Sequence, residues 1–431
     1  MSQKYISSDK NKGNSFGGGD IIIDVLKKYG LIEFINSKLG KRSPRAEYDY
    51  SEVLITLFIS QCRGAKRIEN IYDSLDALLC HPRFQKGMSP DTFLYACKEL
   101  SEPNQYYKKK TISDKLAKKA ETQKCYKSHE VNSSEKFNEM LIDGALLVGV
   151  LNKEQKYTLD YDTTEIINKI KHSRRFYKGN GKKAYSPAVA MINNIPIYIE
   201  NRNGDSNAAF NLSETIEKAL NLLEKKGIQI ETIRVDAAGF SMGFVQMAEN
   251  RGLKYVTRAK SPKVRNEKKF IRNWTKVNNS KISTEFGDTT IYFGDNETRL
   301  IVRKTKEPTK EPEFWGLISN DFEKTNEEIV DYYAKRGDSE NLFSSLNEFG
   351  WKLLPMRKFE HNTVYLYITA FNYILFRFIT ELFESHSPYV TKKMELKTFT
   401  DKFMAVSSIW EGDSLNFLSR GKDYLRLSAF T

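Results

Sequence analysis

Apolar residues recur at helical spacing over the first hundred residues of the chain. Residues 20–40, DIIIDVLKKYGLIEFINSKLG, carry apolar side chains with a period of about 3.6 and end at Gly40, a residue suited to closing a helix. Residues 50–65 and 67–81 continue the same pattern. The spacing therefore predicts a region of consecutive short helices.

A further helix is predicted to begin at Pro90. Ser89 is suited to cap it, Pro90 to fill its first position, and Asp91 to interact with the positive end of the helix dipole. Short helices joined by tight turns indicate a helix-turn-helix-like unit that binds DNA, with the helix from Pro90 as the candidate recognition helix. A purely structural bundle of helices explains the same pattern equally well.

Two segments beside these helices lack a regular apolar pattern. Residues 1–19 are polar and Gly-rich, which predicts a flexible arm and not a signal peptide. Residues 103–135 are Lys-rich, which indicates either a solvated linker that follows DNA or a charged surface helix. The helical DNA-binding region is thus predicted to span residues 20–135.

From residue 136 the pattern changes to strands that alternate with helices. Apolar and polar residues alternate in KYTLDYDTTEI, and Asn193 and Asn194 separate two apolar runs, as in a tight hairpin turn. An amphipathic helix is predicted next, followed by a strand that ends at Asp236, a helix and a further strand. Three strands in a meander, then helix, strand, helix, strand, is the order of an RNase H-like domain.

Short strands replace this alternation from residue 260. Segments such as TTIYFGD and TRLIVRKT predict a β-rich insertion over residues 260–324. Helices are predicted over residues 325–380 and, as a C-terminal helical region, over residues 381–431. The predicted fold class is therefore α/β, with an RNase H-like catalytic core, a β-rich insertion and a preceding all-α DNA-binding region; the core takes in residues 136–259 and 325–380.

Charge adds a partner to this picture. The 431 residues carry a net charge of +13, and 40% of them are apolar. These values fit a protein of roughly two to four domains whose natural partner is a polyanion. Residues 251–281 hold eleven Lys or Arg and one acid, and residues 169–183 hold no acid, so both are candidate DNA-contact segments. A solvated loop explains the second run as well.

Cysteines and apolar runs bear on where the protein works. The four cysteines lie far apart without a C-x-x-C pair, so neither a zinc ribbon nor a disulfide framework is indicated. The most apolar run, from Val364, is interrupted by Asn372 and Arg377 and is too short to span a membrane. The sequence thus predicts a cytoplasmic, nucleoid-associated protein in which this run is a buried helix.

Two strands place acids where a metal-dependent reaction needs them. Cleaving a phosphodiester with an activated water takes two divalent ions, and Mg²⁺ prefers oxygen ligands. Asp160 and Asp162 lie on one face of a predicted strand, and Asp236 ends another strand at the kind of edge where α/β sheets bind ligands. An edge strand explains the first pair, and a helix cap explains Asp236, without any catalysis.

A third acid, Glu340, belongs to a predicted helix together with Tyr333 and Arg336. The three side chains fall at i, i+3 and i+7, so they point off one face of that helix. If Glu340 completes a metal site, Arg336 and Tyr333 reach the phosphates and sugars beside the scissile bond. An exposed helix with an i,i+4 ion pair between Arg336 and Glu340 explains the same row without any function. Such a pair stabilises a helix by only about 0.3–0.5 kcal/mol.

Together these segments resemble the catalytic motifs of the DDE insertion-sequence transposases. LDYDTT, RVDAAGF and YAKRGDSEN are most similar to the insertion-sequence-four superfamily, whose third motif runs Tyr, two residues, Arg, three residues, Glu, six residues, Lys. The first two motifs look most like the insertion-sequence-1380 branch. Asp162 and Asp236 are 74 positions apart and Glu340 follows 104 positions later; the longer gap is where such enzymes carry a β-rich insertion.

This resemblance implies a site and a reaction. Asp162, Asp236 and Glu340 are implied to bind two Mg²⁺ ions, or Mn²⁺ in their place, with Tyr333 and Arg336 assisting. The implied reaction cleaves at terminal inverted repeats and joins the 3′-hydroxyls to target DNA, within a homodimer on DNA and without a membrane partner. Asp160 is then a spare acid beside the site.

A few positions depart from this pattern or have a plain structural explanation. The Lys of the third motif is replaced by Asn347, which brings no charge, so Lys352 is a candidate substitute. Trp274 and Trp315 lie in the predicted insertion, where similar enzymes stack an aromatic on a displaced base, although a core role explains each tryptophan more simply.

Two other functions fit the same residues. One is an RNase H-like nuclease that cleaves without strand transfer, which the absence of joined products distinguishes. The other is a domesticated DNA-binding protein whose acids are structural, which metal-independent binding without cleavage distinguishes.

Overall fold

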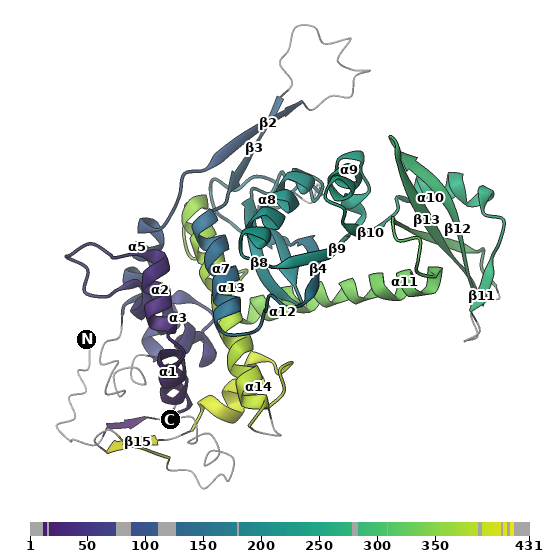
Figure 1. Ribbon diagram of the computed structural model, residues 1–431. Helices are drawn as coiled ribbons and strands as arrows, with labels where there is room; N and C mark the ends of the chain where they lie inside the picture. The colour runs from purple at the N-terminus through teal and green to yellow at the C-terminus, as the bar shows by residue number, and fades with distance from the viewer. Residues whose placement is uncertain are drawn as a thin grey trace.

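The computed structural model of the protein is mixed α/β, built around one large mixed sheet (Figure 1). It describes residues 12–14, 17–74, 88–110, 126–178, 181–277, 283–307, 309–386, 390–406, 408–411 and 414–417. Among these residues, eleven strands form the sheet, in the order β11-β12-β13-β14-β10-β9-β4-β7-β8-β3-β2.

Five neighbouring strands form the part of the sheet around the predicted catalytic aspartates. They are β4 (Lys156–Thr163), β7 (Ala188–Ile192), β8 (Ile195–Arg202), β9 (Gln229–Val235) and β10 (Lys254–Arg258). β4, β7 and β8 pair antiparallel in chain order, whereas β9 is parallel to β4 on its other side and β10 is parallel to β9. Asn193 and Asn194 both have positive φ, 51° and 63°, which confirms the predicted hairpin turn between β7 and β8.

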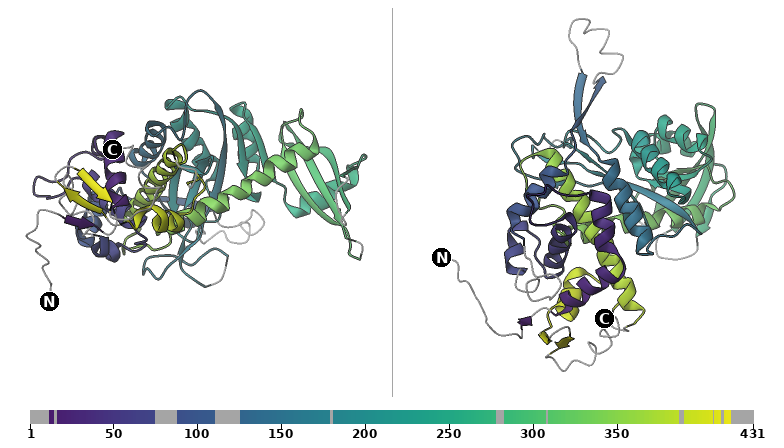
Figure 2. Two further views of the ribbon diagram at one scale, coloured as in Figure 1. Left: turned by 90° about the horizontal axis from the view of Figure 1, so that it is seen from below. Right: turned by 60° about the vertical axis from the view of Figure 1, so that its left-hand side comes forward.

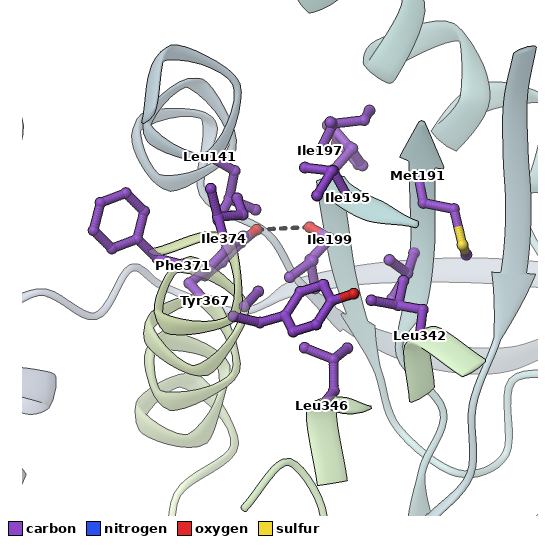
Figure 3. Packing of buried hydrophobic residues seen from close by; sticks show 14 of the residues in the cluster. Leu141, Met191, Ile195, Ile197, Ile199, Leu342, Leu346, Tyr367, Phe371 and Ile374 are labelled. Carbon is purple, nitrogen blue, oxygen red and sulfur yellow. Dashed lines mark hydrogen bonds between the residues drawn. The ribbon is translucent and has the colours of Figure 1, made fainter. Parts of the chain in front are cut away.

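Helices cover both faces of these strands. They are α7 (Glu135–Leu147), α8 (Leu212–Lys225), α9 (Met242–Asn250) and α13 (Phe359–Glu384). On one face the main-chain oxygen of Ile199 accepts a hydrogen bond of 2.6 Å from Tyr367 of α13, within a core that also contains Leu141 of α7 (Figure 3). On the other face Arg202 donates to Thr215 of α8 at 2.8 Å. Ile199 and Arg202 lie on opposite faces because side chains alternate along a strand.

The helices predicted near the N-terminus are present. They are α1 (Gly18–Lys28), α2 (Leu31–Leu39), α3 (Tyr50–Cys62), the 3₁₀-helix η1 (Ile68–Ser74) and α5 (Pro90–Glu99). Gly40 ends α2 with φ of 84°, and the Ser89 hydroxyl accepts a hydrogen bond from the Thr92 amide to cap α5. Phe93 of α5 packs edge-on against Tyr365 of α13. Residues 75–87, which belong in part to a predicted helix, lie outside the described residues.

For the described residues after α5 the prediction of a helix or linker is wrong, while residues 111–125 lie outside the described residues. Residues Gln105–Lys110 form β2 and residues Tyr126–Asn132 form β3, which pair antiparallel with each other. β3 in turn pairs with the end of β8, at Val131 and Arg202, so the hairpin extends the main sheet and projects from it (Figure 1). The Lys-rich pattern did not indicate strands because β3 pairs with the distant β8 and β2 pairs with β3, and local periodicity does not report such pairing.

The predicted β-rich insertion is present, and it continues the main sheet. Its strands are β11 (Thr275–Val277), β12 (Ser283–Phe293), β13 (Asn296–Lys306) and β14 (Glu313–Ser319). β14 pairs antiparallel with β10, through Val256 and Ser319 among other pairs. The short α10 (Ser261–Glu267) and η3 (Lys268–Phe270) precede these strands.

The predicted helix carrying Glu340 is divided into three parts. These are α11 (Asn326–Ala334), the 3₁₀ turn η4 (Lys335–Gly337) and α12 (Asp338–Glu348). They form a rod that passes from the insertion strands to the middle of the main sheet (Figure 1). The tighter winding of a 3₁₀ turn shifts the side-chain directions beyond it, by about 60° over three residues.

Among its described residues, the predicted C-terminal helical region is only partly helical. After α14 (Leu396–Phe399) and the π-helical η5 (Thr400–Met404), two strands follow, β15 (Ser408–Glu411) and β16 (Ser414–Phe417). β15 also pairs with β1 (Lys12–Asn14), so part of the predicted N-terminal arm is a strand. Both predictions failed because these strands are stabilised by pairing between the two ends of the chain.

The apolar run from Val364 forms the central helix α13, as predicted. It is the one helix among the described residues that is long and apolar enough to cross a membrane, and 83% of that apolar stretch is buried inside the fold. Contacts join α13 to α3 and α5 as well as to α7 and β8, and Figure 2 shows the N-terminal helices beside it. α13 is therefore a shared core element of the sheet and the N-terminal helices.

Candidate active site

The register of two parallel strands brings Asp162 and Asp236 together. β4 and β9 pair Asp160 with Arg234 and Tyr161 with Val235. The next residue on each strand is an aspartate, so Asp162 and Asp236 are neighbours at the carboxyl end of the pair. This is the edge at which open α/β sheets bind ligands.

Asp236 is fixed by the turn that follows it. Its carboxylate accepts a hydrogen bond of 2.9 Å from the Ala238 amide and so caps the 3₁₀-helix η2 (Ala237–Gly239). A Cβ at Gly239 would lie 2.9 Å from Thr257 Oγ1, so glycine permits the close approach of this turn to β10. Asp236 is therefore both the predicted strand-end acid and a helix cap.

The pKa of Asp236 is raised above its ordinary range. Burial is the main cause, and the negative charge of Asp162 adds to it, whereas the Ala238 amide and Arg336 oppose both. Two carboxylates thus face each other in a partly buried place, which is an arrangement that a bound cation would stabilise.

Arg336 is the cation beside this pair. Its Nη1 donates to Asp162 Oδ2 at 2.8 Å. Burial would lower the pKa of Arg336, but Asp162 and Tyr333 outweigh it and raise the pKa above its ordinary value. The guanidinium also lies 5.8 Å from the ring centre of Tyr333, whose side chain is buried. The structure therefore gathers four of the five predicted site residues: Asp162, Asp236, Tyr333 and Arg336.

Glu340 lies apart from this group. It is exposed on α12, and among the residues that the structure describes it forms no group with the two aspartates that could hold a metal ion. Leu342 and Leu346 bury the opposite side of α12 beside Met191 and Ile199 (Figure 3). At 100° per residue, Glu340 points about 160° away from Leu342. The single row predicted for Tyr333, Arg336 and Glu340 is interrupted by the turn η4.

Asp160 has a structural partner. Its two carboxylate oxygens accept hydrogen bonds of 2.7 Å from Nε and Nη2 of Arg234. Arg234 also donates to the main-chain oxygen of Tyr332 at 2.7 Å and lies over its ring. The ion pair thus ties β4, β9 and α11 together and holds the segment that leads to Arg336.

A divalent cation fits the aspartate pair in part. Two carboxylates offer the oxygen ligands that Mg²⁺ prefers. Within the described part of the chain, however, no group of three or more His, Cys, Asp or Glu side chains lies close enough together to hold a metal ion. The pair therefore supplies two ligands, and the third carboxylate of the predicted site is not beside them.

Three further residues near the gathered group were not assigned to the site from the sequence. The charges of Asp236 and Asp162 act on Tyr177, whose pKa is raised mainly by burial and then by these acids and Glu165. Lys178 and Arg258 are the other two: the first acts on Asp236 and the second on Tyr333. Tyr177 and Lys178 belong to the basic run of residues 169–183, whose lack of acids was the available signal.

The two tryptophans of the insertion have different surroundings. Trp315 lies 5.8 Å from the Tyr333 ring, and the guanidinium groups of Arg303 and Arg258 lie 5.0 and 6.0 Å from its ring centre. Trp274 packs against Phe314 farther along the insertion. Trp315 therefore adjoins the aspartate site, and Trp274 does not contact it in the described structure.

Two residues were considered in place of the Lys of the family's third motif, and both Asn347 and Lys352 lie elsewhere. The side-chain oxygen of Asn347 is buried without a hydrogen-bond partner. Lys352 is exposed and lines a separate cavity with Lys169, Lys171 and Arg357.

Comparison with known proteins identifies the family. The family model described as transposase DDE domain group 1 matches residues 14–409, which is nearly the whole chain. The chain therefore belongs to the DDE transposase domain family, and this membership implies a transposase activity. No curated protein matches the chain closely enough to be reported. The match spans the aspartate strands, the insertion and α13 alike.

Proposed function

We propose that the protein is a DNA transposase of the insertion-sequence-four superfamily, in its insertion-sequence-1380 branch. It cleaves the ends of an insertion sequence and joins the released 3′-hydroxyls to target DNA. The observation that carries this proposal is the adjacent pair Asp162 and Asp236, held at the carboxyl end of two parallel strands with Arg336 beside them. The strand order β8-β7-β4-β9-β10 supports an RNase H-like core.

In this proposal the aspartates hold divalent ions. Bound Mg²⁺ or Mn²⁺, two ions in the complete site, would activate the attacking oxygen and stabilise the leaving one. Asp162 and Asp236 hold the ions at the sheet edge, and Glu340 is the proposed third ligand. Arg336 and Tyr333 stand beside the aspartates to bind the phosphates and sugars next to the scissile bond.

The partners follow from the same proposal. The terminal inverted repeats are bound by the N-terminal helices, with α5 as the proposed recognition helix; its Tyr95 is exposed, whereas Phe93 and Ala96 are buried. Bringing two ends together requires a homodimer on DNA. The protein is proposed to work in the cytoplasm, at the nucleoid.

The test is strand cleavage and joining on DNA that carries the element's ends, with Mg²⁺. Wild type is expected to give cleaved and joined products, and Asp162→Ala, Asp236→Ala and Glu340→Ala to give neither. The matched control is Asp331→Ala, an exposed acid of α11. Retained activity in one of the three variants removes that residue from the site, and for Glu340 this result would agree with its position apart from the aspartates.

The same assay separates the two other functions. Cleaved strands without joined products indicate a nuclease. Metal-independent DNA binding with no cleavage under Mg²⁺ or Mn²⁺ indicates a domesticated DNA-binding protein.

A further inference from the structure

A cavity separate from the aspartate pair lies between the N-terminal helices and the core. This cavity of about 800 Å³ opens between three segments that are far apart in the sequence. They are residues 67–69 at the start of η1, residues 167–172 at and after β5 (Ile166–Ile167), and residues 352–357 after α12. The first segment belongs to the N-terminal helices, and the other two follow elements of the candidate active site. The cavity therefore lies where these two regions meet.

The rim of this cavity is basic. Five of its residues are Lys or Arg and only one, Glu69, is an acid; the basic residues are Arg67, Lys169, Lys171, Lys352 and Arg357. All five are exposed, and none of them forms an ion pair within the described part of the chain. Like charges gathered without counter-charges repel one another, so the rim is suited to an anionic ligand.

The floor of the cavity is aliphatic. Ile68, Ile170, Leu353, Leu354 and Pro355 line it, and Ile167 adds a side chain that is 48% exposed. A small anion such as free phosphate needs only the cations. A nucleic-acid strand offers both partners at once, because its phosphates are charged and the carbon atoms of its sugars are apolar.

The cavity is within a few nucleotides of the aspartates. Ile167 follows Asp162 by five residues, which an extended chain spans in at most about 18 Å. Successive nucleotides of one strand rise by about 3.4 Å in duplex DNA, so this distance corresponds to at most about five nucleotides. A strand whose phosphate lies at the aspartates can thus continue into the cavity.

We infer that this basic cavity binds the sugar–phosphate backbone of a DNA strand that passes the aspartate pair. The phosphates pair with the basic rim and the sugars lie on the aliphatic floor. The inference rests on the proposed function for the position of the strand at the aspartates. It adds a binding site shared by the N-terminal helices and the core, in which Lys352 acts beside Arg357 and the loop after β5.

The experiment measures DNA binding by the full chain without cleavage. Fluorescence anisotropy of a labelled DNA duplex is recorded in EDTA from about 50 to about 300 mM NaCl. The test variant is Lys169→Ala/Lys171→Ala/Lys352→Ala/Arg357→Ala. The control is Lys153→Ala/Lys156→Ala, which removes two exposed lysines near the start of β4, at the opposite end of that strand from Asp162. Thermal melting checks that both remain folded.

The variant and its control are expected to differ in affinity and in salt dependence. Each lost phosphate contact lowers the slope of log K against log salt by about 0.9, so the test variant, which lacks four cations, loses about 3.6 units of slope and binds at least about tenfold more weakly. The control changes the affinity less than about twofold. Binding of the folded test variant at wild-type affinity and slope overturns the inference, as does a wild type that binds no DNA or prefers an RNA duplex.

Cleavage assays keep this inference apart from the proposed function. If the test variant binds DNA like wild type while Asp236→Ala alone abolishes cleavage, the transposase proposal stands and the basic cavity is not a DNA site. If wild type never cleaves DNA but the test variant loses binding, the basic cavity stands as a DNA-binding site and the transposase proposal fails.

Discussion

Asp160 and Asp162 are two residues apart on one strand face, but their charges are balanced differently. Asp160 is buried against Arg234, whereas Asp162 shares Arg336 with Asp236 at the strand end. The position along β4 decides which acid is structural. Asp162 is near the carboxyl end of the strand, where open α/β sheets bind ligands, whereas Asp160 lies farther back in the strand. A buried acid with a bidentate Arg partner is fully compensated, and a pair of acids sharing one Arg is not.

Replacing Arg234 should destabilise the protein strongly. Arg234→Ala leaves Asp160 buried without its partner and is expected to lower the free energy of unfolding by about 3–5 kcal/mol, measured in urea at pH 7. Asp160→Asn/Arg234→Ala should recover part of this loss, because the unpaired charge is removed. A change below about 1 kcal/mol for the single variant would contradict the structural role of the pair.

Asp236 should make the metal-free protein less stable at neutral pH. Because its pKa is raised in the folded state, its favourable contribution is full below the unfolded pKa, about 3.9, and is lost as the pH rises through the folded value. Asp236→Asn keeps an oxygen for the Ala238 amide and carries no charge. In EDTA its Tm should therefore exceed that of wild type at pH 7, and the difference should vanish towards pH 3.5.

Mg²⁺ should reverse this order of stability, so that wild type melts at a higher temperature than Asp236→Asn. A ligand present at about ten times its Kd stabilises the folded state by about 1.4 kcal/mol, and only wild type keeps both aspartates. Wild type is expected to gain Tm with MgCl₂, whereas Asp236→Asn gains less. Equal gains in both proteins, with Asp331→Asn as the control for non-specific effects, would count against an ion at the aspartate pair.

At the residue scale the sequence pointed to residues that the structure brings together. Strand alternation and motif spacing brought forward Asp162, Asp236, Tyr333 and Arg336, which the structure gathers. The partner of Asp160 was not predicted, because Arg234 lies 74 positions away and only the register of two parallel strands pairs them. Nor does periodicity predict a 3₁₀ turn, so the direction of Glu340 was missed.

Among the elements, α7 is held in place by a charged contact on its exposed side. Asp143 accepts hydrogen bonds from Lys38 of α2 at 2.6 Å and from Lys226, which follows α8, at 2.8 Å. Burial would raise the pKa of Asp143, but the two lysines outweigh it and lower the pKa. One carboxylate thus joins the N-terminal helices to the helices over the sheet.

Asp143→Asn should weaken this junction in a pH-dependent way. Loss of the Asp143 charge is expected to lower the free energy of unfolding by about 1 kcal/mol at pH 7, because its ion pairs with Lys38 and Lys226 are partly exposed and screened. A lowered pKa stabilises above the unfolded value, about 3.9, and this stabilisation is lost as the pH falls through the folded value. The gap in unfolding free energy should hold from pH 7 to about pH 5 and close below about pH 4; an unchanged gap at low pH would rule out the ion pair as its cause.

Elements with their own periodicity or caps were predictable, and elements that depend on distant pairing were not. α5 shows the first case, with Ser89 and Pro90 at its start, and the hairpin of Asn193 and Asn194 shows it for strands. β3 and β15 show the second, through their pairing with β8 and β1. Each is paired to a segment far along the chain, and neither has an apolar alternation that would mark it as a strand.

On the scale of the whole molecule, α13 unites parts that the sequence suggested as separate regions. It contacts α3 and α5 on one side and α7 and β8 on another. The insertion likewise joins the main sheet through β14 and β10. Order along the chain predicted these regions but not their shared core, because a helix buried on all sides has no periodic polar face to show which neighbours surround it.

The packing of α7 on α13 should therefore control the stability of the whole fold, and the two helices approach closely at Gly144. A Cβ at Gly144 would lie 2.6 Å from a ring carbon of Phe371, which is itself buried and stacked on Phe34. Alanine gains about 1 kcal/mol of helix propensity over glycine, but overpacking costs about 1–3 kcal/mol, so Gly144→Ala should be destabilising on balance.

A matched glycine and a double variant make this prediction sharp. Gly243 of α9 has only an ordinary contact, Ser213 Oγ at 3.5 Å from the added Cβ, so Gly243→Ala should be neutral or stabilising by up to about 1 kcal/mol. Phe371→Leu makes room at α13, so the double variant Gly144→Ala/Phe371→Leu should be more stable than the sum of the single changes by at least about 1 kcal/mol in urea unfolding. Additive effects, or a Gly144→Ala variant as stable as Gly243→Ala, would show that α13 can shift without cost and does not unite the two regions.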